Sequence, residues 1–296
     1  MSVASLIRAL QEHQDTLGAL TDARAAQLSS ILHALEKRIL GAVAKGSGAV
    51  TDASLVDLTA NVNRLIRNSG AEAWIGGSVR DSAIQGFRMQ AASVMSQLNV
   101  TSWDAVSVPQ VRQAFLTFER RTLGALINST SEKSFRAQWA AQLRTKAMDP
   151  IRQGLGSRLS TAQLTGETWE DVSRSLIDDV GNLNLVKNTP EQVAKTFTKT
   201  AMTDVFNDVA VGSARAAGLD RFENILGAAD QHTPICLFAS QQPPLTLSEW
   251  NALEFEGTPV GMPSRHFGCG SFMAAAVPAA KDIDWEEVQA ETMETA

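Results

Sequence analysis

Both cysteines of the chain and two of its four histidines lie in one short C-terminal segment. Their order is His232-x3-Cys236, then 29 residues, then His266-x2-Cys269. Imidazole nitrogen and thiolate sulfur are the ligands of tetrahedral zinc sites, which commonly use two close pairs joined by a longer loop. Asp230 could orient a ligating histidine through a hydrogen bond. The spacing is therefore compatible with a structural zinc site made of His232, Cys236, His266 and Cys269.

The same residues are also compatible with three other arrangements. Neither pair is a C-x2-C knuckle, so His266 and the two cysteines could simply pack the loop and hydrogen-bond locally. A Cys236–Cys269 disulfide would need an oxidising environment. A nucleophilic thiol would need a base such as His266 beside it. Neither cysteine has the local signature of a cysteine protease, and HExxH, GxSxG, Walker A and dinucleotide-binding glycine patterns are absent from the sequence.

Composition excludes several classes of protein. The formal net charge of −6 over 296 residues argues against non-specific binding to a DNA backbone, which needs a basic surface. Direct DNA contact would therefore require a local basic patch. No uninterrupted apolar run is long enough to cross a bilayer, and the first residues are not typical of a secretory signal. Two cysteines are too few for a disulfide scaffold, so a reducing cytoplasm is the expected site of synthesis.

The first half of the chain has the periodicity of consecutive helices. Leu28, Ile31, Leu32, Leu35 and Ile39 follow the i, i+3, i+4, i+7 spacing of one helical face. A further helix, whose start Thr51-Asp52 can cap, is predicted to carry Leu55 to Ile66 and to stop near Asn68-Ser69-Gly70. Others are predicted around 72–97, 108–128 and 131–153. This texture favours a helical bundle or arm.

The remainder has clearer start and stop signals. Two helix starts have the spacing of an N-cap with a reciprocal capping partner: Thr168 with Asp171, and Thr189-Pro190 with Gln192. Gly218 is placed to end the second of these helices. Phe222 to Ala228 and Ser271 to Val277 are strand candidates. If these two strands pair, the two His/Cys pairs meet at one end of a small sheet. Between them, the sequence predicts a loop with one short helix, Ser248 to Leu253.

These patterns predict a mainly α protein. An N-terminal helical arm or bundle, residues 1–155, precedes a small α+β domain, residues 156–280, with a short two- or three-stranded sheet. The final segment, 281–296, is an acidic tail that favours a solvated helix or a frayed end.

The C-terminal half resembles the domain of phage Mu F-like minor head proteins, also called phage head morphogenesis proteins. The resemblance covers roughly 155–280 and rests on the order of its motifs. That order is a helix with Thr203-Asp204 and Asn207, then Gly218, a short strand, Asp230, Thr233, Cys236, a long loop, Pro263, His266, Cys269, and a strand ending in Val277-Pro278. The stretch from Leu164 to Ile177 resembles the capped helix that this family has upstream.

The sequence departs from the family pattern at three places. His232 stands where arginine is common, Gly270 replaces the arginine that usually follows the last cysteine, and Thr203-Asp204 replaces the more usual Thr-Glu. The missing arginine removes any salt bridge that it would make. The additional His232 adds a ligand to the metal interpretation.

The resemblance implies a structural role rather than an enzymatic one. Members of the family are minor components of tailed-phage heads that associate with the portal vertex or the capsid interior and act in assembly, packaging or DNA delivery. The implied partners are the portal protein, the major capsid protein or a scaffold protein, without a membrane. The implied location is the virion head near the portal, after synthesis in the host cytoplasm. On this interpretation Asp230, His232, Thr233, Cys236, Pro263, His266 and Cys269 close a structural loop.

Two other functions remain open. One is a metal- or thiol-dependent hydrolase centred on the His/Cys cluster, and the other is a helical adaptor without a viral role. A stoichiometric metal with an open coordination position would favour the hydrolase. A gene neighbourhood encoding portal, terminase or capsid proteins would argue against the adaptor.

Overall fold

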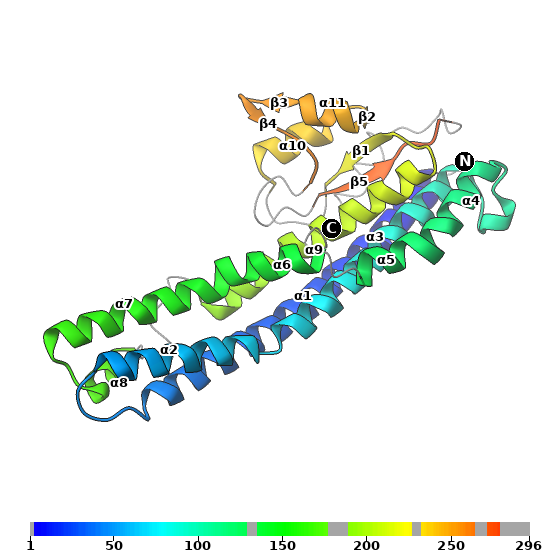
Figure 1. Cartoon of the computed structure of the whole chain (residues 1–296). Helices are drawn as coiled ribbons and strands as arrows, with labels where there is room; N and C mark the ends of the chain where they lie inside the picture. Colours follow the sequence, from blue (N-terminus) through cyan, green and yellow to red (C-terminus); the bar gives the residue numbers. More distant parts are fainter. Residues whose placement is uncertain (1–2, 129–134, 177–188, 227–231, 264–270, 279–296) are drawn as a thin grey trace. The chain divides into compact units, whose positions relative to one another are not determined.

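The fold is mainly α, with a long helical region followed by a small antiparallel sheet, as the sequence predicts (Figure 1). The computed structural model describes residues 3–128, 135–176, 189–226, 232–263 and 271–278. The chain divides into two compact units. Unit 1 comprises 1–22, 77–136 and 196–296, and unit 2 comprises 23–76 and 137–195. Both units take residues from either side of position 155, so this division differs from the predicted boundary between arm and domain.

Unit 2 is helical throughout its described residues. Its elements are the second part of α1 (Val3–Val43), α2 (Asp52–Arg67), the start of α3 (Ala71–Gln97), most of α6 (Phe135–Leu143), the π-helical turn η3 (Arg144–Met148), α7 (Asp149–Thr165), α8 (Trp169–Ser175) and the start of α9 (Pro190–Ala216). The predicted apolar face of α1 supplies Leu35 and Ile39 to the core, where they cluster with Val62, Leu155 and Trp169. Burial of these side chains supplies the main stabilisation of the unit.

Side-chain caps fix where the helices of unit 2 begin. Thr51 and Thr168 each accept a hydrogen bond from the backbone of the third helical residue, and the side chains of Ser54 and Asp171 bond back. Thr189 and Gln192 make the same reciprocal pair at the start of α9, with backbone-to-side-chain distances of 3.0 and 3.3 Å. All three caps were predicted, because each satisfies amide groups that a helix start leaves without partners.

Unit 1 combines helices with the sheet. Its elements are the first part of α1, the rest of α3, the short helix η1 (Trp103–Ala105), α4 (Pro109–Thr117), the π-helical turn η2 (Phe118–Leu123), α5 (Gly124–Asn128), most of α9, β1 (Arg221–Ile225), α10 (Pro234–Ser240), β2 (Leu245–Thr246), α11 (Leu247–Ala252), β3 (Glu254–Phe255), β4 (Thr258–Pro259) and β5 (Phe272–Ala275). Strand order is β2-β1-β5, all antiparallel, and β3 and β4 form a separate hairpin.

Both strand candidates form strands, and they pair with each other, which the sequence left as a condition. Phe222 lies opposite Ala275, and Ile225 opposite Phe272. The chain therefore leaves β1 and enters β5 at the same end of the sheet. One helix was not predicted: Pro234–Ser240 forms α10, where the sequence suggested a loop. Pro234 at its first position favours the helix because proline has the required φ and needs no amide partner there. The predicted short helix at 248–253 is confirmed as α11.

Within unit 1, α3 and α9 approach each other closely at Gly86. A Cβ atom at Gly86 would overlap the carbonyl group of Phe206 on α9. Nearby, Ser82 donates a hydrogen bond from its hydroxyl to the carbonyl oxygen of Met202. Small residues on α3 thus let the two backbones come together.

The substitution Gly86→Ala is expected to destabilise the protein by about 1–3 kcal/mol. Alanine favours a helix by about 1 kcal/mol over glycine, but overlap with a backbone atom outweighs that gain. The matched control is Gly156→Ala on α7, where the added Cβ meets nothing within 4 Å and stabilisation is expected. Urea unfolding of both variants checks the prediction. Equal effects of the two substitutions would contradict the close approach.

Candidate functional site

The segment that carries the motif order begins on α9 and ends at β5, and the described part of it lies in unit 1 (Figure 1). Helix α9 ends as predicted: Gly218 has φ 78°, and the Leu219 amide bonds the Ala214 carbonyl at 3.0 Å. A left-handed residue is needed to stop the helix in this way, and glycine adopts it without strain. The chain then turns directly into β1, whose residues Phe222 to Ile225 are buried.

On one side of β5, the strand pairs with β1; on the other side, helical side chains take the place of a neighbouring strand. Asn207 of α9 accepts a hydrogen bond from the Met273 amide at 2.9 Å and donates to the Ser271 carbonyl at 3.0 Å. Gln97 of α3 donates to the Ala275 carbonyl at 2.7 Å and accepts from the Val277 amide at 2.9 Å. A carboxamide carries both a donor and an acceptor, so it can mimic a peptide group.

A third carboxamide completes this edge. Gln90 accepts from the Ala275 amide at 3.4 Å, and Asn207, Gln90 and Gln97 are all at most 2% exposed. The bonded backbone groups belong to Ser271, Met273, Ala275 and Val277, which are the alternate residues whose amides and carbonyls face away from β1. We call these three side chains the carboxamide edge. It satisfies polar groups that would otherwise be buried without partners, and it blocks the addition of a further strand.

The two carboxylates Asp204 and Asp208 lie one turn apart on α9. Asp208 is exposed by surface area, yet partial burial of its carboxylate, followed by repulsion from Asp204, raises its pKa to about 6. Thr203, one residue earlier, is buried, and its carbonyl accepts a hydrogen bond from Asn207 at 3.0 Å. Thr203 of the motif therefore holds the Asn207 carboxamide through its backbone carbonyl.

A glutamate lies inside the sheet layer. Glu223 of β1 is 2% exposed, and burial raises its pKa to about 8. Among the described residues its Oε2 atom has no hydrogen-bond partner. Its strand partner is Ala274, which packs in the apolar cluster with Ile225 and Phe272. At neutral pH this side chain is therefore largely a neutral carboxylic acid in an apolar environment.

The His/Cys segment is described only in part. Cys236 lies on α10, is 2% exposed and packs with Leu226 and Ile235. His232 and Thr233 precede this helix and are half-buried, and the Thr233 carbonyl accepts from the Cys236 amide at 2.9 Å. Pro263 is buried. Asp230, His266 and Cys269 lie outside the described residues. The zinc, disulfide and thiol interpretations depend on these residues, so they stay predictions.

Helix α11 follows β2 directly and is anchored to β1 by a tryptophan. Trp250 is fully buried and donates its indole N–H to the Phe222 carbonyl at 3.0 Å. Thr246 and Glu249 form a capping box that starts this helix, and Arg221 lies 3.8 Å from Glu249. The sheet is thus held at β5 by the carboxamide edge and at β1 by the hydrogen bond from Trp250.

Sequence reasoning identified Asn207 through the motif order but missed Gln90 and Gln97. Their signal was present: the two glutamines are seven residues apart, which places them on one face of α3, and buried Ser93 lies between them. Polar residues that recur on a buried helical face need partners, and here the partner is a strand edge.

Metal-binding groups, membrane-spanning helices and similarity to known proteins complete the description of the site. Within the described ranges, no group of three or more His, Cys, Asp or Glu side chains is placed to hold a metal ion, and no helix is long and apolar enough to span a membrane. No protein-family model matches the chain, and no curated protein or solved structure matches it significantly.

Proposed function

We propose that the chain is a minor head protein of a tailed phage that acts in head assembly or genome packaging near the portal vertex. The proposal rests first on the motif order that resembles the Mu F-like proteins. It is supported by where those residues lie. Thr203 and Asn207 are on α9, Gly218 ends this helix, Cys236 is on a helix packed beside the sheet, and the last motif leads into β5.

The single observation that carries the proposal is the role of Asn207. This residue of the resembling segment is fully buried and bonds two backbone groups of β5. A buried carboxamide engaged with backbone on both sides supports a structural role, because a catalytic side chain must reach a substrate. The motif residue Asn207 thus supports the sheet of unit 1, which is consistent with a structural component.

In this account the His/Cys segment closes the domain. Cys236 is already packed with Leu226 and Ile235, so local packing is the simplest proposed role for the cluster. The alternative to local packing is that His232, Cys236, His266 and Cys269 bind a structural zinc ion. The donor set suits zinc, since imidazole and thiolate are its preferred ligands.

The double substitution Cys236→Ser and Cys269→Ser is expected to loosen the C-terminal part of unit 1 while leaving overall helicity unchanged. A serine hydroxyl at the buried Cys236 position replaces a small apolar group and costs about 1–3 kcal/mol. Limited proteolysis should then cut between β1 and β5 faster than in the parent protein, with unchanged far-ultraviolet circular dichroism. An unchanged C-terminal fragment in both proteins would contradict the proposed closing role.

The proposed function is tested in particles. Quantitative mass spectrometry of purified heads should find the chain in far fewer copies than the major capsid protein. Deletion of its gene should leave particles that fail to assemble or to package DNA normally. Absence of the chain from heads and procapsids, with normal particle yield after deletion, would overturn the proposal.

A further inference from the structure

Unit 2 contains a hollow of about 380 Å³ between the end of α2, the start of α3 and the η3–α7 segment. Its floor is apolar and well packed: Ile75, Leu143 and Met148 are 3%, 1% and 7% exposed. Volumes of this size accommodate small ligands or one large side chain. We call it the α2–α7 hollow.

The rim of the α2–α7 hollow is basic. Arg67 comes from α2, Arg144 from η3 and Arg152 from α7. Glu72 and Asp149 also line it, so three arginines against two acids leave a net charge of +1. Asp149 lies 3.1 Å from Arg152, so these two charges offset each other. In the part of the chain that the structure describes, no ion pair involves Arg67 or Arg144, and both are exposed.

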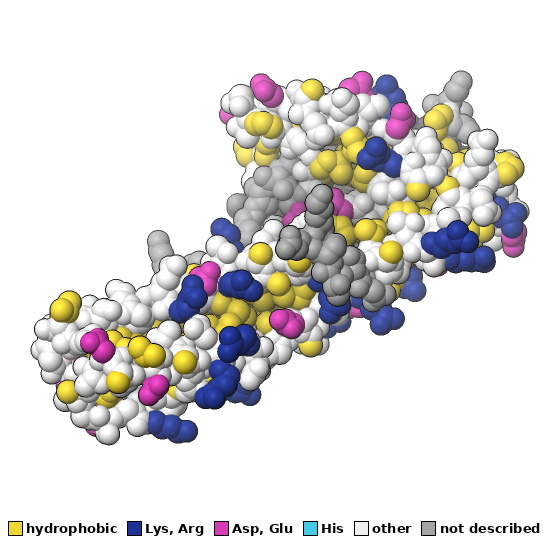
Figure 2. Space-filling view, viewed as in Figure 1, with side chains coloured by type: hydrophobic (Ala, Val, Ile, Leu, Met, Phe, Trp, Pro, Cys, Tyr) yellow, Lys and Arg dark blue, Asp and Glu magenta, His cyan; other side chains and the backbone are white. Residues whose placement is uncertain are grey.

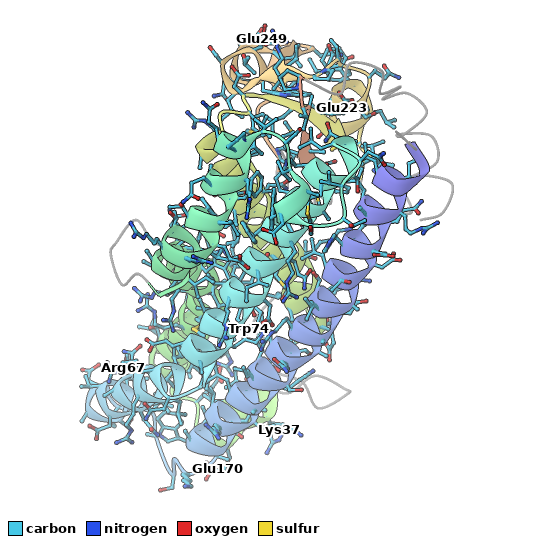
Figure 3. The ribbon with its side chains drawn as sticks, turned by 90° about the vertical axis from the view of Figure 1, so that its right-hand side faces the viewer. Lys37, Arg67, Trp74, Glu170, Glu223 and Glu249 are labelled. Carbon is cyan, nitrogen blue, oxygen red and sulfur yellow. The ribbon has the colours of Figure 1, made fainter. Side chains whose placement is uncertain are left out.

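Arginines and apolar side chains both line the hollow. Figure 2 shows dark blue Lys and Arg side chains on either side of exposed yellow apolar atoms in this part of unit 2. Figure 3 places Arg67 at the surface near the end of α2, with Trp74 in the following helix. The side chains of Trp74 and Trp139 are buried, and their ring centroids are 6.2 Å apart. Each directly precedes a residue that lines the hollow, Ile75 and Ala140 respectively. The two tryptophans therefore pack directly beneath the lining.

The spacing of the arginines indicates an extended ligand. Arg144 lies at the start of η3, and Arg152 on α7 is already paired with Asp149, so Arg144 supplies the available charge of this segment. Arg67 lies on a different helix across the hollow. Carboxylates distributed along a peptide match this layout better than a single small anion does. An apolar floor with a charged rim is also how hot-spot side chains are held at protein interfaces.

We propose that the α2–α7 hollow binds an acidic peptide segment of a protein partner. The segment inserts one bulky apolar side chain over Ile75, Leu143 and Met148 and places carboxylates beside Arg67 and Arg144. The proposal uses only the described residues of unit 2 and does not depend on a role in phage heads.

The test selects the ligand directly from a displayed library of random dodecapeptides on the full chain. Enriched peptides should share a large apolar residue flanked by Asp or Glu. Their affinity, measured by fluorescence anisotropy, should fall at least tenfold in Arg144→Glu and in Arg67→Glu. It should also weaken as salt is raised, because exposed charge pairs are screened.

Two further variants distinguish binding at the α2–α7 hollow from a general effect of the protein's charge. Arg120→Glu on η2 makes the same charge change in unit 1 and should leave peptide affinity within twofold of the parent. Ala140→Phe fills the hollow without changing charge and should abolish binding; circular dichroism shows whether it is folded, and the two exposed arginine variants carry the test if it is not. Failure to enrich acidic peptides, or enriched peptides that bind Arg67→Glu and Arg144→Glu as tightly as the parent, would overturn the proposal.

Discussion

Replacing Glu223 by Gln is expected to stabilise the protein at pH 8 and to leave its stability nearly unchanged at pH 4.5. The reason is burial: this carboxyl group is 2% exposed and its pKa rises from 4.5 to about 8 in the folded chain. Glutamine has the shape of the protonated acid but cannot ionise. It therefore removes the cost of holding a proton, or a charge, in an apolar environment.

The sign follows from proton binding. Below about pH 4.5 the carboxyl is protonated in both states and adds no pH dependence. Between that value and about 8 the folded chain keeps the proton while the unfolded chain loses it, so each unit rise in pH lowers the free energy of unfolding by about 1.4 kcal/mol. Above about pH 8 both states are ionised, the slope disappears and the full penalty remains.

Urea unfolding of parent and Glu223→Gln across pH 4.5 to 9 measures this difference. The matched control is Glu254→Gln on β3, which makes the same chemical change at an exposed position. The free energies of unfolding of the parent and of Glu223→Gln should diverge steadily as pH rises, and that of the control should follow the parent. Parallel curves throughout would show that Glu223 is ionised in the folded protein at neutral pH.

Replacing Asn207 by Leu is expected to destabilise the protein by about 2–4 kcal/mol. Leucine has nearly the same size but offers no hydrogen bonds, so the Met273 amide and the Ser271 carbonyl lose their partners inside the protein. Each buried polar group left without a partner costs about 1–3 kcal/mol. The exposed Asn251→Leu substitution on α11 is the control and should change stability little.

Hydrogen exchange gives a local test of the same claim. In Asn207→Leu the Met273 amide should exchange faster, whereas in Gln90→Leu the change should appear first at the Ala275 amide. This site-by-site correspondence distinguishes the carboxamide edge from general loss of packing. Unchanged protection at Met273 in a folded Asn207→Leu variant would refute the role of Asn207.

Local features of the fold could be predicted from the sequence because they depend on neighbouring residues. The caps at Thr51, Thr168 and Thr189 and the helix end at Gly218 follow from the hydrogen-bonding capacity and backbone freedom of single residues. The strands β1 and β5 were predicted from two apolar stretches bounded by turn residues, whereas their pairing was only considered. The short helix α10 was missed because prolines and glycines around it suggested a continuous loop.

Features that depend on distant residues could not be predicted in this way. The carboxamide edge joins Gln97 to residues 178 and 180 positions later, and no local pattern fixes such a register. The two units are also interleaved along the chain, because α1, α3 and α9 each supply residues to both. Helical periodicity identifies the buried face of each helix but not which other helix covers it.

Within the candidate site, the sequence identified Cys236 and Asn207 but not their roles, and it missed Gln90, Gln97 and Glu223. Cys236 was considered as a metal ligand, a disulfide partner and a nucleophile, and the structure places it on α10 against Leu226. Asn207 was one residue among several in a motif and proves to be a main support of β5. Glu223 carried no sequence signal, since burial of a charged residue in a strand depends on what the rest of the chain packs against it.

The most direct test of the proposed function is co-assembly with a portal protein encoded beside this chain. The two proteins would be expressed together, purified through a tag on the portal, and examined by size-exclusion chromatography and native mass spectrometry. The account predicts co-elution with the portal ring at a fixed number of chains per ring. Elution of the chain apart from the ring at every ratio, together with its absence from assembled heads, would contradict it.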